Sequence, residues 1–264
     1  MPPRQSHANE PARKEKPLDR IDSAVRFDHV IVLRAGTRVL DDVTFEIPWS
    51  STVSLVGPSG AGKTTAIEVG MAVRRVDSGV VRLLGLEPGV AIASGRVGVM
   101  ISSAGLPSGV RVGELVRFVR SLHDAPLPLE DLIDRAGLQS RLDCSTDRLS
   151  DSEVQQLRFA LALAGDPDLV FLDEPGVGLD GPARDALRTN LQRLKAEGRT
   201  VLLATRYGEV AAPSADGVLL LERGRLIGED MVDGMRSRLT EHEPVIDCNG
   251  LVQLSMAAGA PGRP

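Results

Sequence analysis

The strongest chemical signal in the sequence is a glycine-rich loop, GPSGAGKTT, at residues 57–65, which fits the spacing G-x-x-x-x-G-K-[ST]. It follows a short apolar run and precedes a helical pattern. In that context successive backbone N–H groups surround a phosphate at a helix N-terminus. The residues expected to form this nucleotide-binding loop are Gly57, Pro58, Ser59, Gly60, Ala61, Gly62, Lys63, Thr64 and Thr65.

Each residue type in this loop has a chemical task. Gly57, Gly60 and Gly62 allow backbone conformations and close approaches that a Cβ would block. Lys63 can reach the β- and γ-phosphates as a point charge, and the Thr64 hydroxyl can bind Mg²⁺. A Gly/Ser turn with an exposed lysine is the alternative, and the motif and its context together argue against it.

A second acidic site supports the first. The apolar run 168–173 ends in Asp173, and Glu174 follows. An acid at the end of a strand beside a phosphate loop can hold Mg²⁺, and the next carboxylate can polarise an attacking water. We therefore expect Asp173 to bind the metal and Glu174 to act in catalysis with Lys63. An acidic turn before Pro175 is the alternative.

Strands that alternate with helices must position these residues, which indicates an α/β fold with a parallel sheet. Buried or alternating apolar patterns predict strands, and 3.6-residue patterns predict helices. The expected strands are 25–33, 39–47, 52–56, 79–85, 96–101, 168–173 and 200–205, with a hairpin at 217–229. The expected helices are 64–73, pieces of 112–142, one that begins near 150, and 182–197.

Composition narrows the class of protein. The chain has 264 residues, 42% of them apolar, and a net charge of −5, which argues against a nucleic-acid partner. No apolar run approaches the ~18 residues of a membrane span. The two cysteines, Cys144 and Cys248, fit no zinc spacing, and a reduced, cytosolic protein is expected.

The segments GPSGAGKTT, LSDSE, FLDEP, GLD and TR resemble, in order and spacing, the nucleotide-binding subunit of an ATP-binding cassette (ABC) transporter. The resemblance covers about residues 25–230. It implies a P-loop NTPase core with a mainly parallel sheet, an antiparallel β subdomain and a helical subdomain at about 103–150. The ATP-binding domain would span 21–232, between a disordered tail (1–20) and a C-terminal tail (233–264).

The resemblance also implies cofactors and partners. The cofactors would be ATP and Mg²⁺, and the activity ATP hydrolysis, slow alone or dependent on a partner. A separate transmembrane permease subunit would sit on the helical subdomain, with the chain on the inner face of the cell membrane. Two cassettes, as a homodimer or a heterodimer, would meet head to tail, so that each ATP lies between one phosphate loop and the other cassette's signature loop.

The signature loop departs from the family pattern LSGGQ. Ser150 remains, but Asp151 and Ser152 replace the glycines whose backbone approaches the γ-phosphate. A carboxylate a few Å from phosphate is repulsive by ~1 to several kcal/mol, depending on screening. The same stretch fits a helix start, with Asp151 or Ser152 as the cap of a helix that Glu153 begins.

Two further positions also depart from the family. Ser102 stands where a glutamine is usual, and serine is too short to contact both Mg²⁺ and water. Arg206 stands where a histidine is usual. It stays protonated and cannot act as an acid or base, although it can neutralise phosphate charge. A surface arginine at a strand end is an equal alternative. The family's D-loop aspartate is retained as Asp180.

Three functions remain open. The first is the ATPase subunit of a transporter. The second is a nucleotide-gated binding or regulatory module that hydrolyses ATP poorly, and the altered Ser102, Asp151 and Arg206 favour it. The third is a soluble cassette without a transport role, although its relatives carry long insertions or a second cassette that 264 residues cannot hold.

Overall fold

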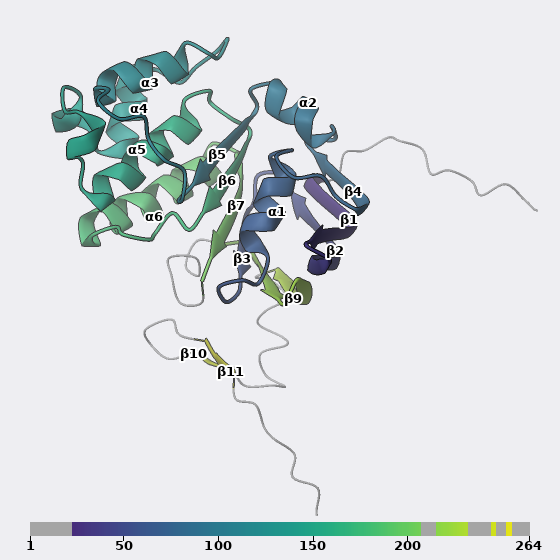
Figure 1. The fold of residues 1–264 in the computed structure, drawn as a ribbon. Coiled ribbons are helices and arrows are strands. Elements are labelled where there is room, and N and C mark those ends of the chain that lie inside the picture. Colours follow the sequence, from purple (N-terminus) through teal and green to yellow (C-terminus); the bar gives the residue numbers. More distant parts are fainter. Residues whose placement is uncertain (1–22, 207–214, 232–243, 247–251, 255–264) are drawn as a thin grey trace, which may run out of the picture.

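The centre of the fold is a six-stranded mixed sheet (Figure 1). The computed structural model describes residues 23–206, 215–231, 244–246 and 252–254. The strand order is β5-β6-β7-β3-β8-β9, and all neighbours are parallel except the β8–β9 hairpin. The strands are β3 (Thr52–Val56), β5 (Val97–Ile101), β6 (Leu169–Asp173), β7 (Thr200–Thr205), β8 (Gly217–Glu222) and β9 (Arg225–Met231).

The inner strands are apolar because both faces of the sheet are covered. All residues of β6 are buried, and they alternate between two cores. Leu169 and Phe171 belong to one core, and Val170 and Leu172 belong to the other. The near-continuous apolar run that predicted this strand is therefore explained by packing on both sides.

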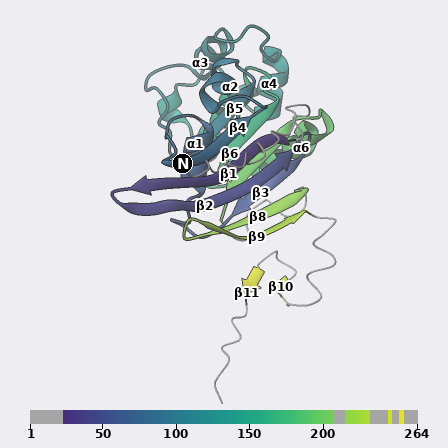
Figure 2. The same ribbon diagram turned by 90° about the vertical axis from the view of Figure 1, so that its right-hand side faces the viewer.

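One face of the sheet carries helix α1 (Lys63–Gly70) and a second, antiparallel sheet (Figure 2). The second sheet has the order β2-β1-β4 and comprises β1 (Ser23–Arg34), β2 (Thr37–Pro48) and β4 (Ser78–Leu83). Ala35 and Gly36 turn the β1–β2 hairpin, both with positive φ, as a tight hairpin turn requires. Helix α1 packs in the core shared by the two sheets.

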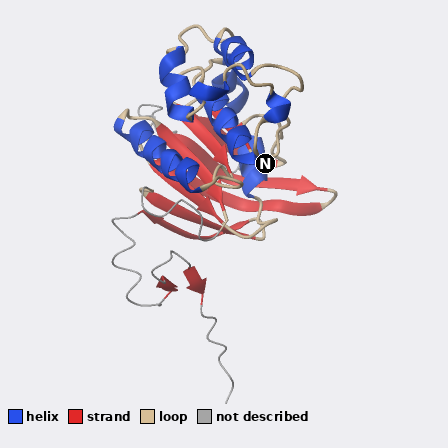
Figure 3. Ribbon diagram, turned by 90° about the vertical axis from the view of Figure 1, so that its left-hand side faces the viewer, coloured by secondary structure: helices blue, strands red, loops and turns tan. Residues whose placement is uncertain are grey.

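The other face carries the helices that form the second core (Figure 3). They are α3 (Val112–Arg120), α4 (Leu129–Ala136), α5 (Asp151–Leu163) and α6 (Gly181–Ala196), with short 3₁₀ turns at Gln139–Arg141 and Thr146–Arg148. None of the helices in the described part of the chain is long and apolar enough to cross a membrane.

The predicted fold class, a mainly parallel sheet with an antiparallel β subdomain and a helical subdomain, is confirmed. The strand predicted at 52–56 has the same bounds in the structure. The helix predicted at 64–73 ends early, at Gly70, because the backbone turns left-handed at Ala72. A short helix, α2 (Pro88–Ala93), was not predicted.

The two terminal segments lie mostly beyond what the structure describes. The tail predicted at 1–20 lies outside the described residues. Of the segment 233–264, the structure describes two short strands, β10 (Pro244–Ile246) and β11 (Val252–Leu254), which pair antiparallel.

Candidate nucleotide site

Four adjacent strands deliver the candidate site to one edge of the sheet. Ile101 pairs with Asp173, Asp173 pairs with Ala204, and Thr205 pairs with Val56, so the strands β5, β6, β7 and β3 end side by side. The residues that follow them are Ser102, Glu174, Arg206 and Gly57. Ligands of open α/β sheets bind outside the carboxyl ends of the strands, which is where these residues lie.

The glycines of the phosphate loop meet different constraints. A Cβ at Gly57 would lie 2.1 Å from the carbonyl oxygen of Leu221, so this glycine is required by packing against β8. Gly62 combines a φ of +109° with a Cβ position 2.8 Å from the carbonyl of Val39. Gly60 has a φ of +79° and open space around it. Gly60 is thus required for its conformation alone, Gly57 for close packing alone, and Gly62 for both.

Lys63 begins α1 and is held inside the loop that precedes it. Its Nζ donates to the carbonyl oxygens of Gly57 at 2.8 Å and Pro58 at 3.0 Å, and lies 4.0 Å from Oε1 of Glu174. The side chain is only 5% exposed, and burial lowers the pKa of the ammonium group. The cation is therefore fixed at the mouth of the loop, close to where phosphates would lie.

Thr64 and Asp173 meet across the site. The Thr64 hydroxyl donates to Oδ2 of Asp173 at 3.1 Å. The other carboxylate oxygen, Oδ1, is buried and has no hydrogen-bond partner among the described residues. Burial raises the pKa of Asp173, since desolvation penalises its charged form.

These oxygens suit Mg²⁺, which prefers hard oxygen ligands and keeps several waters. No group of three His, Cys, Asp or Glu side chains forms a metal cage within the residues that the structure describes. The hydroxyl of Thr64 and the orphaned oxygen of Asp173 would thus hold a magnesium ion that also binds water and phosphate.

Glu174 lies between two cations. Its Oε2 accepts from Nε of Arg206 at 3.1 Å, while its Oε1 lies 4.0 Å from Nζ of Lys63. Its backbone has a φ of +47°, an uncommon conformation for a non-glycine residue, and its N–H donates to the carbonyl of Ala204. Arg206 therefore contacts the predicted catalytic carboxylate, and it is also an exposed arginine at the end of β7, as the alternative reading expected.

The signature loop opens α5 through a capping box. The Ser150 hydroxyl accepts from the N–H of Glu153 at 3.3 Å, and the Glu153 carboxylate accepts from the N–H of Ser150 at 2.8 Å. This hydrogen bond holds the pKa of Glu153 below its usual range. The expectation that Asp151 or Ser152 caps a helix begun by Glu153 is wrong, because the helix begins at Asp151 and Ser150 caps it.

The way the signature loop starts α5 determines which of its side chains can contact a ligand. Ser152 is buried and Asp151 is exposed. The capping contact uses Ser150 as an acceptor, so its own hydroxyl proton can still be donated. An incoming phosphate would thus meet one hydroxyl donor and one carboxylate.

The two remaining predicted residues lie on the loops around the site. Ser102 follows β5 and is half-buried. Asp180 caps α6, and its side chain accepts from the N–H of Ala183 at 2.9 Å. The residue pattern did not reveal two polar contacts of α5, made by Gln155 and Arg158, because each depends on loops distant in the sequence.

A phosphate loop at the carboxyl edge of a parallel sheet defines a P-loop NTPase. The family model of ABC transporters matches residues 40–177. The chain is 33% identical over 216 residues to the Nod factor export ATP-binding protein I of Paraburkholderia xenovorans, covering 79% of this chain and 71% of that one. It is 35% identical over 199 residues to the protein of the same name from Burkholderia pseudomallei, covering 72% of this chain and 65% of that relative's length.

Solved structures share the fold. An ATP-binding subunit of an ABC transporter aligns with a TM-score of 0.74 at 23% identity, over 83% of this chain and 94% of that chain. An ATP-binding cassette bound to ADP and Pi aligns with a TM-score of 0.71 at 21% identity, over 78% of this chain and 98% of that one. The chain belongs to the ABC transporter family, and its fold is that of the family's ATPase cassette.

Proposed function

We propose that the chain binds Mg-ATP and couples it to a separate transmembrane permease subunit, on the cytoplasmic face of the membrane. One observation carries the proposal: the phosphate loop, Asp173 and Glu174 meet at one edge of the sheet. Relatives named as export ATP-binding proteins support a role in transport.

Each residue has a role in this proposal. The N–H groups at the start of α1 and the ammonium of Lys63 bind the phosphates. Thr64 and Asp173 hold Mg²⁺, which neutralises charge on the phosphate oxygens. Glu174 accepts a hydrogen bond from the attacking water and draws off its proton. A second cassette, identical or different, completes the site with its own signature loop.

The first test is Lys63→Ala in the full-length chain. Lys63 is the buried cation nearest the expected phosphates, and a charge-assisted hydrogen bond contributes about 1.5–3 kcal/mol. We expect the Kd for Mg-ATP, measured by calorimetric titration, to rise about 10- to 100-fold. Lys195→Ala is the matched control, because Lys195 pairs with Asp216 near the start of β3. Equal ATP affinities for both variants would contradict the proposal.

Coupling to a membrane subunit needs a separate test. We expect the tagged chain to co-purify from detergent-solubilised membranes with an integral membrane protein, which would be its permease subunit. Recovery of the chain from the aqueous fraction alone, with no membrane protein bound, would favour the cassette without a transport role.

The contact between Arg206 and Glu174 supports a second candidate function, a nucleotide-gated module that hydrolyses ATP slowly. The hydrogen bond from Arg206 stabilises the charged form of Glu174, the predicted general base, so it opposes the proton transfer that the base must carry out. In this case ATP acts as a ligand that controls association.

Glu174→Gln distinguishes the two functions. A general base contributes about 10²–10⁴-fold to the rate, so turnover in the assembled complex falls by that factor if the chain is a hydrolysing subunit. Turnover stays unchanged if the chain is a gated module. Phosphate release measures both outcomes, and Glu130→Gln on the exposed side of α4 serves as the control.

A further inference from the structure

Two loops border the candidate site on the side of α5. The β5 loop comprises residues 102–110, and the β6 loop comprises residues 174–180. They follow adjacent parallel strands, whose last residues Ile101 and Asp173 are paired. Within the described residues, no hydrogen bond joins these two loops directly. A hydrogen-bonded connection between them must therefore pass through a third element.

Helix α5 provides polar contacts to both loops. Nε2 of Gln155 donates to the carbonyl oxygen of Val177 at 3.0 Å, in the β6 loop. Nη2 of Arg158 donates to the carbonyl oxygen of Ala104, in the β5 loop. The two side chains also meet, since Nη1 of Arg158 donates to Oε1 of Gln155 at 3.4 Å. Residues three apart on a helix are neighbours, so one helix face holds both side chains.

Stability alone does not account for this arrangement. Gln155 is 5% exposed, and burial lowers the pKa of the Arg158 guanidinium. No carboxylate pairs with Arg158 in the described part of the chain, and its Nε is buried without a hydrogen-bond partner there. A partly buried cation without a counter-ion contributes less to stability than a paired one, so these contacts are not explained by charge pairing.

We propose that Gln155 and Arg158 are positioning residues that couple the β5 loop to the β6 loop across α5. The signature loop opens this helix, so the pair connects three segments around the nucleotide: Ser102 and its loop, the signature helix, and the loop between Glu174 and Asp180. The inference rests on the proposed function in one respect, that ATP is what moves these loops.

The coupling is tested first without nucleotide, by hydrogen–deuterium exchange of the full chain. Arg158→Met keeps the length of the side chain and removes its donors. We expect amide exchange in the β5 loop to rise about tenfold, the effect of losing about 1–1.5 kcal/mol of hydrogen bonding. We also expect faster exchange in the β6 loop, which Arg158 does not contact. Arg188→Met is the matched control, because Arg188 is a half-buried arginine of α6 whose pairing within the described residues is with Asp185 of the same helix.

Two further variants separate coupling from a general loss of structure. Gln155→Leu should speed amide exchange in both loops. The effect of the double variant on exchange should be smaller than the sum of the two single effects, because the two residues act in one network. Arg158→Lys keeps the charge and the fold but lacks the fork that reaches both partners, so it should loosen the β6 loop as Arg158→Met does. Thermal midpoints identify any variant that fails to fold.

The outcomes separate this inference from the proposed function. Protection of residues 57–65 on addition of Mg-ATP reports nucleotide binding, and its absence overturns the proposed function alone. If Arg158→Met and Arg158→Lys speed exchange in the β5 loop and leave the β6 loop unchanged, the coupling is overturned. If both loops respond, and in addition ATP no longer slows exchange in the β5 loop of Arg158→Met, the coupling is established.

Discussion

At the scale of single residues, the site contains carboxylates in different surroundings. Asp173 is buried and hydrogen-bonded to one neutral hydroxyl, whereas Glu174 lies between Lys63 and Arg206. Because burial raises its pKa, we expect the charged Asp173 to destabilise the protein without a metal and a bound cation to reverse that effect. This arrangement is common for a metal ligand, since a bound metal ion then supplies the partner that the carboxylate oxygen lacks in the folded protein.

Asp173→Asn should therefore stabilise the nucleotide-free protein at neutral pH. Burial raises the pKa of Asp173, so between its unfolded and its folded pKa the native state binds more protons than the unfolded state. The free energy of unfolding then falls as the pH rises through this interval. We expect a higher thermal midpoint for the variant at pH 7 in EDTA. The advantage should vanish below the ordinary aspartate pKa of 3.8.

Asp185→Asn is the control for this prediction, because Asp185 is exposed on α6. A less stable Asp173→Asn at pH 7 would mean that the contact with Thr64 outweighs the desolvation of the charge.

At the scale of elements, the signature loop is first of all the start of α5. Replacement of an N-cap serine by alanine costs about 1 kcal/mol. Ser150→Ala should thus lower the free energy of unfolding by about that amount without any nucleotide, as measured by denaturant titration. Ser121→Ala, which removes one exposed hydroxyl contact to Phe118, should change stability far less. If Ser150→Ala matches that control, the capping box contributes little to stability.

The sequence predicted the fully buried strands well, and it predicted short elements with little apolar periodicity less well. The strand 52–56 was predicted correctly because a short, nearly all-apolar run that ends at a glycine is typical of a buried central strand. Helix α2 was missed because its six residues show too little periodicity. The phosphate loop could be found from its spacing. The contact between Arg206 and Glu174 could not, since it depends on the register of β6 against β7.

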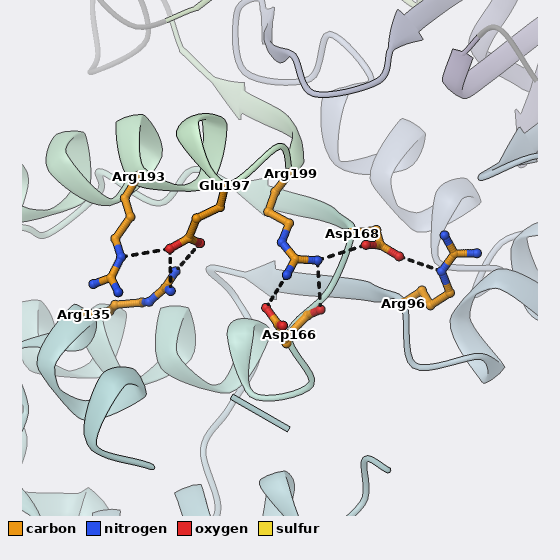
Figure 4. Close-up of polar contacts among 7 residues, drawn as sticks. All are labelled: Arg96, Arg135, Asp166, Asp168, Arg193, Glu197 and Arg199. Carbon is orange, nitrogen blue, oxygen red and sulfur yellow. Dashed lines mark hydrogen bonds and ion pairs between the residues drawn. The ribbon is translucent and has the colours of Figure 1, made fainter. Parts of the chain in front are cut away.

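At the scale of the whole molecule, ion pairs connect the strands at the edge of the sheet opposite the nucleotide site (Figure 4). Arg199 binds Asp166 and Asp168, and Arg96 also binds Asp168, which connects the starts of β5, β6 and β7. The helical subdomain has its own link, in which Arg135 of α4 forms two hydrogen bonds with Glu197, at 2.9 and 2.8 Å. The sheet is thus held at its amino edge, and its carboxyl edge is left to the site.

Glu197→Gln should weaken the link between α4 and the end of α6. Arg135 is 5% exposed and would keep its charge with a poorer partner, a change of about 2 kcal/mol in the free energy of unfolding. Burial raises the pKa of Glu197, but hydrogen bonds from Arg135 and Arg193 hold it below its usual value. The stabilisation is therefore present above the unfolded pKa and is lost as the pH falls through the folded pKa.

Urea titrations at pH 7 and below pH 4 measure this prediction. The difference between wild type and Glu197→Gln should shrink in acid, whereas Glu130→Gln should show no deficit at either pH. A deficit that is independent of pH would point to packing rather than charge.

The position of β3 in the sheet also has a consequence for biosynthesis. β3 carries the phosphate loop, yet both of its partners are made much later: Val53 pairs with Leu202 on one side and with Gly217 on the other. At about 5–20 residues per second, a ribosome needs on the order of 10 s to reach those partners after β3. During that time the growing chain holds an apolar strand without neighbours. The nucleotide site should therefore be among the last parts to form. ATP binding can then stabilise the growing chain only after β8 has been synthesised.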